Sequence, residues 1–432
     1  MNSSPPQTAP GVGLSLAQKA DVLQRHTESR HLLEGQILAL LVAPPQGASD
    51  WSSGNYENNC VWTAMYLAAQ SWKYAVTRDP QAKTQADQSA EALFFLHDMV
   101  PQPGICARGW KYNQESSWDE DFFWKIGPMS GRAGHEEWHN QGNRRWVGDF
   151  STDQLCDMFF GLCVYADVAA DEQQQRRVGE QLALIANRVI DWSMRIVDVD
   201  GQPTTWGNMC PYVLEQELKA LVALAMLKGA FRWSGDARLE ETHRWLCDDH
   251  QYDRLAGQAD PEPDPYLNNH SDDHMAAASF YVVLSYDDSK KRIEIYRQGF
   301  KRIAKRTQLE GNAMVSILYH HLCGVDFSDD LAIQTLRDFS TDTTMRETLG
   351  SVGGDIDTSR AWIDYLRWTQ YPLPVPQWKR PRKEYEWAGN PYRIDGHYGM
   401  GGGALGESSV SGADYLFAYW LGRFAGYINE NE

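Results

Sequence analysis

A long apolar run is the first feature that this sequence lacks. A transmembrane helix needs about 20 predominantly apolar residues in succession, and the 432 residues contain no such run. Residues 1–13 are rich in proline, serine and glycine but lack the basic and apolar regions of a secretory signal. We therefore expect no membrane partner, a flexible N-terminus over residues 1–13, and a single domain over residues 14–432.

Cysteine pairs of the kind that bind zinc are also missing. The seven cysteines include no CxxC pair, and their number is odd. Several fall inside apolar helical patterns, which predicts buried, reduced thiols and a cytoplasmic location. Basic residues are scarce as well, because 40 Lys and Arg stand against 58 Asp and Glu, a net charge of −18. Nucleic acids and anionic membranes need a basic footprint, so neither is expected as a partner.

Apolar residues recur with helical spacing along most of the chain. The pattern predicts helices over residues 14–44, 59–76, 152–168, 173–196, 213–233, 237–250, 271–285, 290–306, 310–323, 328–337 and 413–427, and one more that ends near residue 99. Short turns join the helices in pairs, whereas long loops separate one pair from the next. A closed ring of helical hairpins explains this asymmetry, since it gathers the long loops on one face. The sequence has no strict repeat, which argues against an open solenoid. We therefore predict an all-α fold, an (α/α)6-type toroid, complete or incomplete.

Four stretches carry a resemblance to known proteins, namely residues 58–80, 146–162, 269–284 and 412–428. With their serial hairpins, Trp-rich loops and Asp residues at helix starts, they resemble the (α/α)-toroid carbohydrate-active enzymes. This superfamily includes six-hairpin glycosidases, unsaturated glucuronyl hydrolases and toroid polysaccharide lyases. The resemblance spans the architecture of residues 58–428 and implies that an Asp near the start of an inner helix serves as general acid. Asp149 and Asp153 are similar in placement.

The helix start at residues 146–155 is where we first expect chemistry. Ser151 and Gln154 have the spacing of a capping box, and Asp149 and Asp153 flank the predicted helix N-terminus. The apolar stripe of this helix leaves Asp153 and Asp157 on the opposite face. We interpret Asp149 as the general acid and Asp153 as its ionised partner.

A second helix start repeats this pattern. His270, Asp272 and Asp273 precede an apolar helix in the same way, and they are further catalytic candidates. The alternative for both starts is structural, since Asp in a first turn also complements the helix dipole.

Aromatic and charged residues near these starts suit a sugar ligand. Trp138, Trp146 and Trp206 lie in polar loops and could stack on sugar rings. Arg144 and Arg145 could hold an anionic group, and Glu217 is a reserve carboxylate. The alternative is that the large loops pack on their own aromatic residues.

Three motif matches lack the context that they need. His135 and His139 match H-E-x-x-H, but their Gly-rich flanks do not predict the helix that would place both on one face. Gly401, Gly403 and Gly406 match a dinucleotide fingerprint without a βαβ unit. The segment 198–201 (Asp-Val-Asp-Gly) is typical of a plain turn rather than a calcium site. We therefore expect no metal and no cofactor.

Four hypotheses for function follow. The first is a glycoside hydrolase that acts through paired carboxylates on an oligosaccharide, with or without a uronate. The second is a uronate lyase on the same fold, in which His270 and nearby Tyr266, Asn268 and Asn269 neutralise a carboxylate and move protons. The third is a cofactor-free cyclase, dehydratase or isomerase that acts on an apolar terpenoid, and the fourth is a non-catalytic sugar-binding toroid. Fold alone does not choose among them, and the sequence leaves an oligomer open.

Overall fold

The computed structural model describes residues 10–43, 52–113, 138–212, 217–259, 270–324, 330–345, 374, 376–380, 386–389, 391 and 408–432. Helices dominate this part of the chain. They are α1 (Leu16–His26), α2 (Asn59–Thr77), α3 (Pro80–Asp98), α5 (Thr152–Val168), α6 (Glu172–Asp191), α7 (Glu217–Ser234), α8 (Ala237–His250), α9 (Tyr252–Ala256), α10 (His270–Tyr286), α11 (Lys290–Leu309), α12 (Ala313–Cys323), α13 (Asp330–Asp338) and α15 (Ala413–Phe424).

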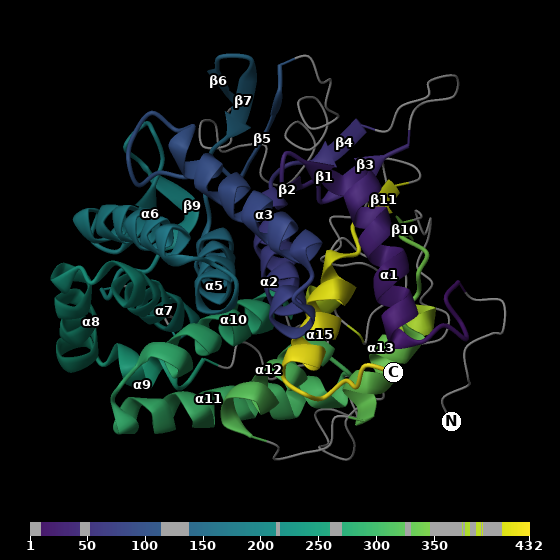
Figure 1. Ribbon diagram of the computed structural model, residues 1–432. Coiled ribbons are helices and arrows are strands. Elements are labelled where there is room, and N and C mark those ends of the chain that lie inside the picture. Colours follow the sequence, from purple (N-terminus) through teal and green to yellow (C-terminus); the bar gives the residue numbers. More distant parts are fainter. Residues whose placement is uncertain are drawn as a thin grey trace, which may run out of the picture.

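The longer helices form two concentric rings. In the inner ring α2 contacts α5, and the contacts continue through α7, α10, α12 and α15 until α15 returns to α2. The outer ring consists of α3, α6, α8, α11, α13 and α1, which follow one another around the outside in Figure 1. The predicted all-α (α/α)6 toroid is confirmed.

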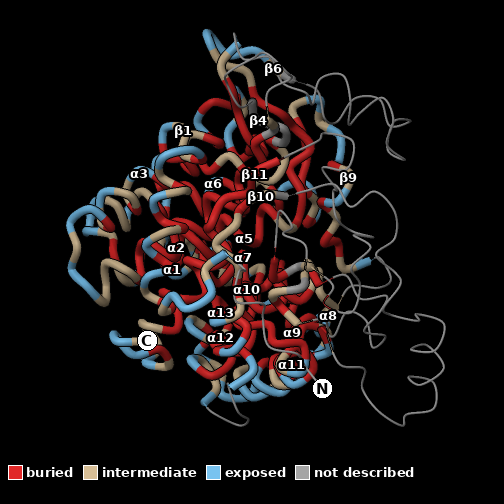
Figure 2. Tube along the Cα trace, turned by 90° about the vertical axis from the view of Figure 1, so that its right-hand side faces the viewer, coloured by how far each residue is buried: buried red, intermediate tan, exposed pale blue. Residues whose placement is uncertain are grey.

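Burial explains which helices lie inside. The inner helix α2 is buried on every side from Asn59 to Trp72, whereas the outer helix α6 buries only one stripe, as its amphipathic sequence requires. Figure 2 shows the buried residues filling the interior. Inner helices also approach closely, because a Cβ on Gly161 of α5 would lie 2.7 Å from the carbonyl oxygen of Ala64 in α2.

Short capped turns close one face of the ring. Each outer helix α3, α6, α8 and α11 begins directly after an inner helix, and its N-cap side chain accepts a backbone hydrogen bond. These caps are Asp79, Asp171, Asp236 and Ser289. An oxygen at this position satisfies an otherwise unpaired N–H of the first turn, so polar turn residues start each outer helix sharply. The predicted turns near residues 77–80, 171, 234–236 and 287–288 are thereby confirmed.

Short strands occupy the opposite end, where the inner helices begin. They are β1 (Leu32–Leu33), β2 (Gln36–Ile37), β3 (Leu40–Val42), β4 (Ser52–Asn55), β5 (Gly109–Tyr112), β6 (Trp138–Gln141), β7 (Arg144–Val147), β8 (Arg195–Val197), β9 (Pro203–Asn208), β10 (Thr344–Met345) and β11 (Ser408–Val410). All pairings are antiparallel, in the orders β1-β2, β10-β11-β3-β4, β5-β7-β6 and β8-β9. The labelled strands lie in the upper half of both views.

Two predicted helices are too long. The helix expected over 14–44 ends at His26 and continues as a single π-helical turn, Thr27–His31, before the β1–β2 hairpin. Glu34 and Gly35 both have positive φ in that hairpin turn (49° and 84°), a conformation that ends any helix. The helix expected over 173–196 ends at Asp191, and residues 195–197 form β8 instead.

The described helices include none that is long and apolar enough to cross a membrane. All seven cysteines lie in described segments as free thiols, and six of them are buried, which confirms the expectation of reduced thiols.

Candidate active site

Asp149 is locked into the structure immediately before α5. Its side chain is fully buried, with Oδ1 accepting a 2.7 Å hydrogen bond from the backbone N–H of Thr205. Its own N–H donates to Asp198 Oδ2 at 2.6 Å, and Arg108 donates to its carbonyl oxygen at 3.2 Å. These contacts tie the β8–β9 hairpin to the start of α5. Asp149 therefore holds these two segments together through Oδ1 and its backbone, while the assignment of Asp149 as general acid stays a prediction.

The predicted capping box at Ser151 and Gln154 is wrong. Ser151 makes no cap hydrogen bond, and its hydroxyl donates instead to Asp153 Oδ1. The side-chain amide of Gln154 donates to the backbone carbonyl of Glu57. Asp153 is thereby oriented by a hydroxyl at its own helix start and remains partly exposed.

Asp153 and Asp272 come together at the open end of the ring. Asp153 lies in the first turn of α5 and Asp272 in the first turn of α10, and their charges interact with each other and with Lys219 in the first turn of α7. Burial raises the pKa of Asp272 to about 6; Lys219 opposes this rise, and Asp273 and Asp153 add to it. Burial lowers the pKa of Lys219, while both carboxylates counter that effect. Three helix starts thus supply two carboxyl groups and an ammonium.

Trp206 borders this group. Its backbone carbonyl accepts hydrogen bonds from Thr152 Oγ1, beside Asp153, and from Lys219 Nζ at 3.5 Å. Its side chain is 52% exposed. Trp206 is therefore accessible from solvent, with its backbone beside the starts of α5 and α7.

A buried acid–base pair lies one turn deeper in the ring. Asp157 Oδ1 and His274 Nε2 are 2.6 Å apart, and His274 Nδ1 lies 3.0 Å from Met314 Sδ. Burial raises the pKa of Asp157, although His274 opposes the shift. Asp157, which the sequence places opposite the apolar stripe, is buried, and its carboxylate joins α5 to α10 inside the core.

His270 and Asp273 belong to a buried ion network. Arg306 binds both oxygens of Asp273 at 2.5 and 3.1 Å, and His270 Nε2 lies 2.9 Å from Glu310 Oε2. Burial alone would lower the pKa of His270, but Glu310 raises it above its ordinary value. His270 and Asp273 are thus engaged in ion pairs that join α10 to α11. These pairs argue against a direct role in catalysis for His270 or Asp273.

The same network contains a set of possible metal ligands. Ligand atoms of His270, Asp273 and Glu310 lie within 4.8 Å of one another. Arg306 contacts both carboxylates, however, with its second contact 3.7 Å from Glu310. A guanidinium already supplies the positive charge that a cation would bring, so the residues do not fit a metal site.

Two of the predicted binding residues on β7, Trp146 and Arg144, make other contacts. Trp146 is buried and stacked on His139 at 4.2 Å, so it is not an open platform. Arg144 pairs with Glu34 at 2.6 Å rather than with an anionic ligand. In the backbone register of this sheet, Arg145 pairs with Lys111 of β5 and with Asn140 of β6. Trp138 pairs with Val147. Because His139 lies on a strand, the helix that H-E-x-x-H needs is excluded.

Glu217 is the first residue of α7, near Lys219.

Residues 198–201 form the turn of the β8–β9 hairpin, as predicted. Several other candidates lie outside the described residues, namely His135, Tyr266, Asn268, Asn269, Gly401, Gly403, Gly406 and the segment 1–9.

Lys219 was missed by sequence reasoning, although a signal for it exists. A lysine in a first helical turn opposes the helix dipole, which favours anions there. Such a placement points to nearby carboxylates, and the structure supplies Asp153 and Asp272. Arg306 and Glu310 have the i, i+4 spacing of a helical pair, but only the fold brings His270 and Asp273 to them.

Comparison with known proteins adds one distant likeness. Neither a family model nor a curated protein matches this sequence. Among solved structures, the chain is similar to a metagenome-derived glycoside hydrolase family 9 endoglucanase, with a TM-score of 0.47 and 12% identity over 94% of this chain and 81% of that one. A likeness of this degree carries no inference about substrate or catalytic residues.

Proposed function

We propose that the protein is a glycoside hydrolase that cleaves an oligosaccharide at the open end of the ring. The proposal rests on the three helix starts of α5, α7 and α10, which bring Asp153, Lys219 and Asp272 within electrostatic range of one another. Hydrolysis of a glycosidic bond needs one protonated and one ionised carboxyl group on either side of the bond. Asp272 suits the first role, because burial holds its pKa near 6.

In this mechanism Asp272 donates its proton to the leaving glycosidic oxygen as the bond to the anomeric carbon breaks. Asp153 acts on the opposite side of that carbon, either by removing a proton from the attacking water or as nucleophile. Lys219 interacts electrostatically with both carboxylates and opposes the rise in the pKa of Asp272. Trp206 supplies an open aromatic face for a neighbouring sugar ring.

Turnover of paired variants tests the proposal. A panel of neutral and uronate-containing oligosaccharides is screened for new reducing ends, and Asp272→Asn and Asp153→Asn are then assayed on the substrate that is cleaved. Each variant should lose at least about a hundredfold in turnover, the usual scale of acid–base catalysis. Asp171→Asn is the matched control, since Asp171 caps an outer helix on the closed face and asparagine is an equally good cap.

The products separate this reaction from its alternatives. Normal turnover in Asp272→Asn would refute the assignment of the acid. Products that carry the ultraviolet absorbance of a conjugated uronate, with no net uptake of water, would show a lyase instead.

A further inference from the structure

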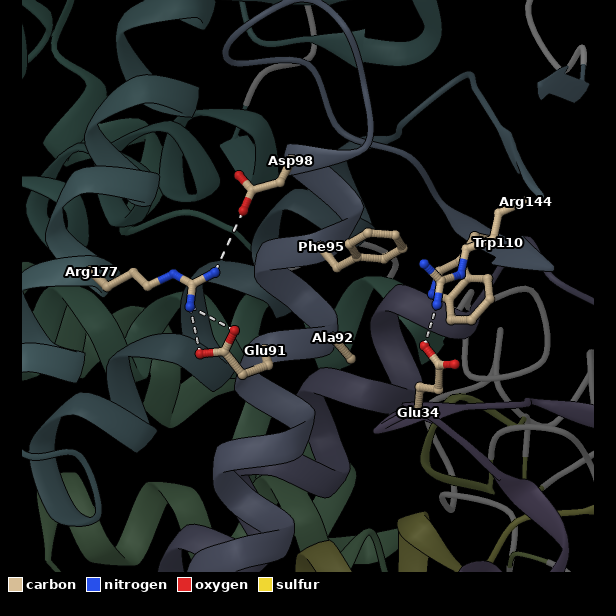
Figure 3. Close-up of a pocket in the computed structure, with 8 residues that line it drawn as sticks. All are labelled: Glu34, Glu91, Ala92, Phe95, Asp98, Trp110, Arg144 and Arg177. Carbon is tan, nitrogen blue, oxygen red and sulfur yellow. Dashed lines mark hydrogen bonds and ion pairs between the residues drawn. The ribbon is translucent and has the colours of Figure 1, made fainter. Parts of the chain in front are cut away.

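A second pocket lies on the outer ring, away from the proposed catalytic group. Its volume is about 230 Å³, and its lining residues come from α3, α6, the β1–β2 turn and the strands β5 and β7. These residues are Glu34, Glu91, Ala92, Phe95, Asp98, Trp110, Arg144 and Arg177 (Figure 3). Neither Asp153, Asp272 nor Lys219 is among them. Ligand pockets for drug-sized molecules measure about 300–1,000 Å³, so this one suits a smaller ligand.

Two ion clusters form opposite walls of the pocket. On one side Arg144 pairs with Glu34 at 2.6 Å. On the other, Arg177 Nη1 lies 2.6 Å from both oxygens of Glu91, and its Nη2 lies 3.5 Å from Asp98. Figure 3 shows Ala92 and Phe95 of α3 between these clusters. The pocket therefore has polar ends and an apolar floor.

The pairing pattern selects the charge of the ligand. Both guanidinium groups are already neutralised by carboxylates, so an anion would have to displace one. A cation is excluded from the aromatic faces, because Arg144 already lies over the rings of Phe95 and Trp110, at 4.9 and 4.6 Å from their centroids. A neutral ligand faces neither obstacle.

Unused hydrogen-bonding capacity remains for such a ligand. A paired carboxylate still has lone pairs that accept from hydroxyl groups, and a guanidinium still has N–H groups that donate. The buried indole N–H of Trp110 also finds no acceptor among the described residues. Vicinal hydroxyls with an apolar face between them match these walls and this floor.

We propose that this pocket is a second binding site, for a single uncharged sugar residue. The site does not depend on the hydrolytic reaction, since it shares no residue with the catalytic group. It would hold a free sugar, or one unit of a glycan, at the outer surface. The open end of the ring would meanwhile act on a different sugar unit.

Binding of monosaccharides to pocket variants tests this proposal. Saturation-transfer NMR is recorded with glucose, galactose, mannose and xylose as neutral probes and with glucuronate as the charged one. Arg177→Ala and Glu34→Ala each remove one partly exposed wall residue and should weaken the binding of the best neutral sugar at least about tenfold, the scale of a hydrogen bond to a charged group. Arg238→Ala is the matched control, because Arg238 forms a similar exposed pair with Asp191 at 2.6 Å elsewhere on the surface.

The outcomes are distinct from those of the activity test. Retention of sugar binding in Trp206→Ala, together with its loss in both pocket variants, supports the second site whether or not the protein is a hydrolase. Binding that survives both pocket variants but is lost in Trp206→Ala would place the sugar at the open end of the ring and overturn the proposal. Failure of every neutral probe, or tighter binding of glucuronate, would overturn it as well.

Discussion

The rate of the proposed reaction should depend steeply on pH because of Asp272. A general acid must be protonated in the free enzyme, and the pKa of this carboxyl group is raised to about 6. Above pH 6, kcat/KM should therefore fall about tenfold for each pH unit. At pH 8 only about 1% of the acid is protonated, so kcat/KM should be about a hundredfold below its plateau.

Replacing Lys219 tests whether Asp272 causes the alkaline fall of kcat/KM. Its ammonium favours the ionised form of Asp272, so replacing it should raise the pKa of the acid and move the alkaline limb to higher pH. For Lys219→Met we expect a move of about one pH unit, the low end for the loss of a neighbouring opposite charge. Lys290→Met, at an exposed lysine of an outer helix start, should leave the limb in place.

Stability gives a second readout that does not need a substrate. The pKa of Asp272 is raised from 3.8 to about 6 in the folded protein. Between these values the unfolded chain releases its proton while the folded chain retains it, so the free energy of unfolding should fall as pH rises from about 4 to 6. Asp272→Asn should remove this part of the pH dependence in urea titrations. Two results together would refute the assignment of Asp272 as the acid. The alkaline limb of kcat/KM would stay in place in Lys219→Met, and the free energy of unfolding of Asp272→Asn would depend on pH as it does in the parent protein.

Three further substitutions have defined expected outcomes. Asp149→Ala leaves the N–H of Thr205 without its acceptor and should lower the free energy of unfolding by about 1–3 kcal/mol, measured by urea denaturation; a neutral effect would contradict its positioning role. Arg306→Leu strands the buried carboxylate of Asp273 and should cost about 3–5 kcal/mol in the same assay, whereas a stable variant would show that the network is dispensable. Trp206→Ala should raise KM severalfold without a change in melting temperature, and an unchanged KM would remove the indole from the substrate site.

Much of the fold could be predicted because local signals agree with it. Apolar periodicity defines α5 and α8 at the predicted bounds, 152–168 and 237–250, and the polar cap Asp236 starts α8. Short turns on one side and long loops on the other imply the ring. These features depend on neighbours within a few residues, which the sequence displays directly.

The segment after His26 could not be predicted in this way. Its apolar residues fit a helix as well as short strands, and short apolar runs are ambiguous by periodicity alone. The decisive partner of β3 is β11, where Leu40 pairs with Val410. Residues 40 and 410 are far apart in the sequence, so the residues near either one do not indicate this pairing.

The two catalytic candidates illustrate what a helix start does and does not determine. Asp153 and Asp272 are recognisable in sequence, since each lies in the first turn of a predicted helix. Asp149 looks equally suitable, yet it is buried and its Oδ1 accepts a hydrogen bond from Thr205 of the β8–β9 hairpin. Whether a carboxylate faces the opening depends on how distant segments pack, and residue type alone does not reveal this.

The ring itself explains how two equivalent residues acquire different roles. All inner helices begin at one opening, and their positive dipole ends favour ionised carboxylates there. A general acid at this position must overcome that field. Asp272 does so through burial and through its neighbour Asp273, which together outweigh Lys219. Asp153 instead accepts a hydrogen bond from Ser151 and is partly exposed at the start of α5. The surroundings of the two carboxyl groups therefore differ between α10 and α5, and the proposed hydrolysis relies on such a difference between its two carboxyl groups.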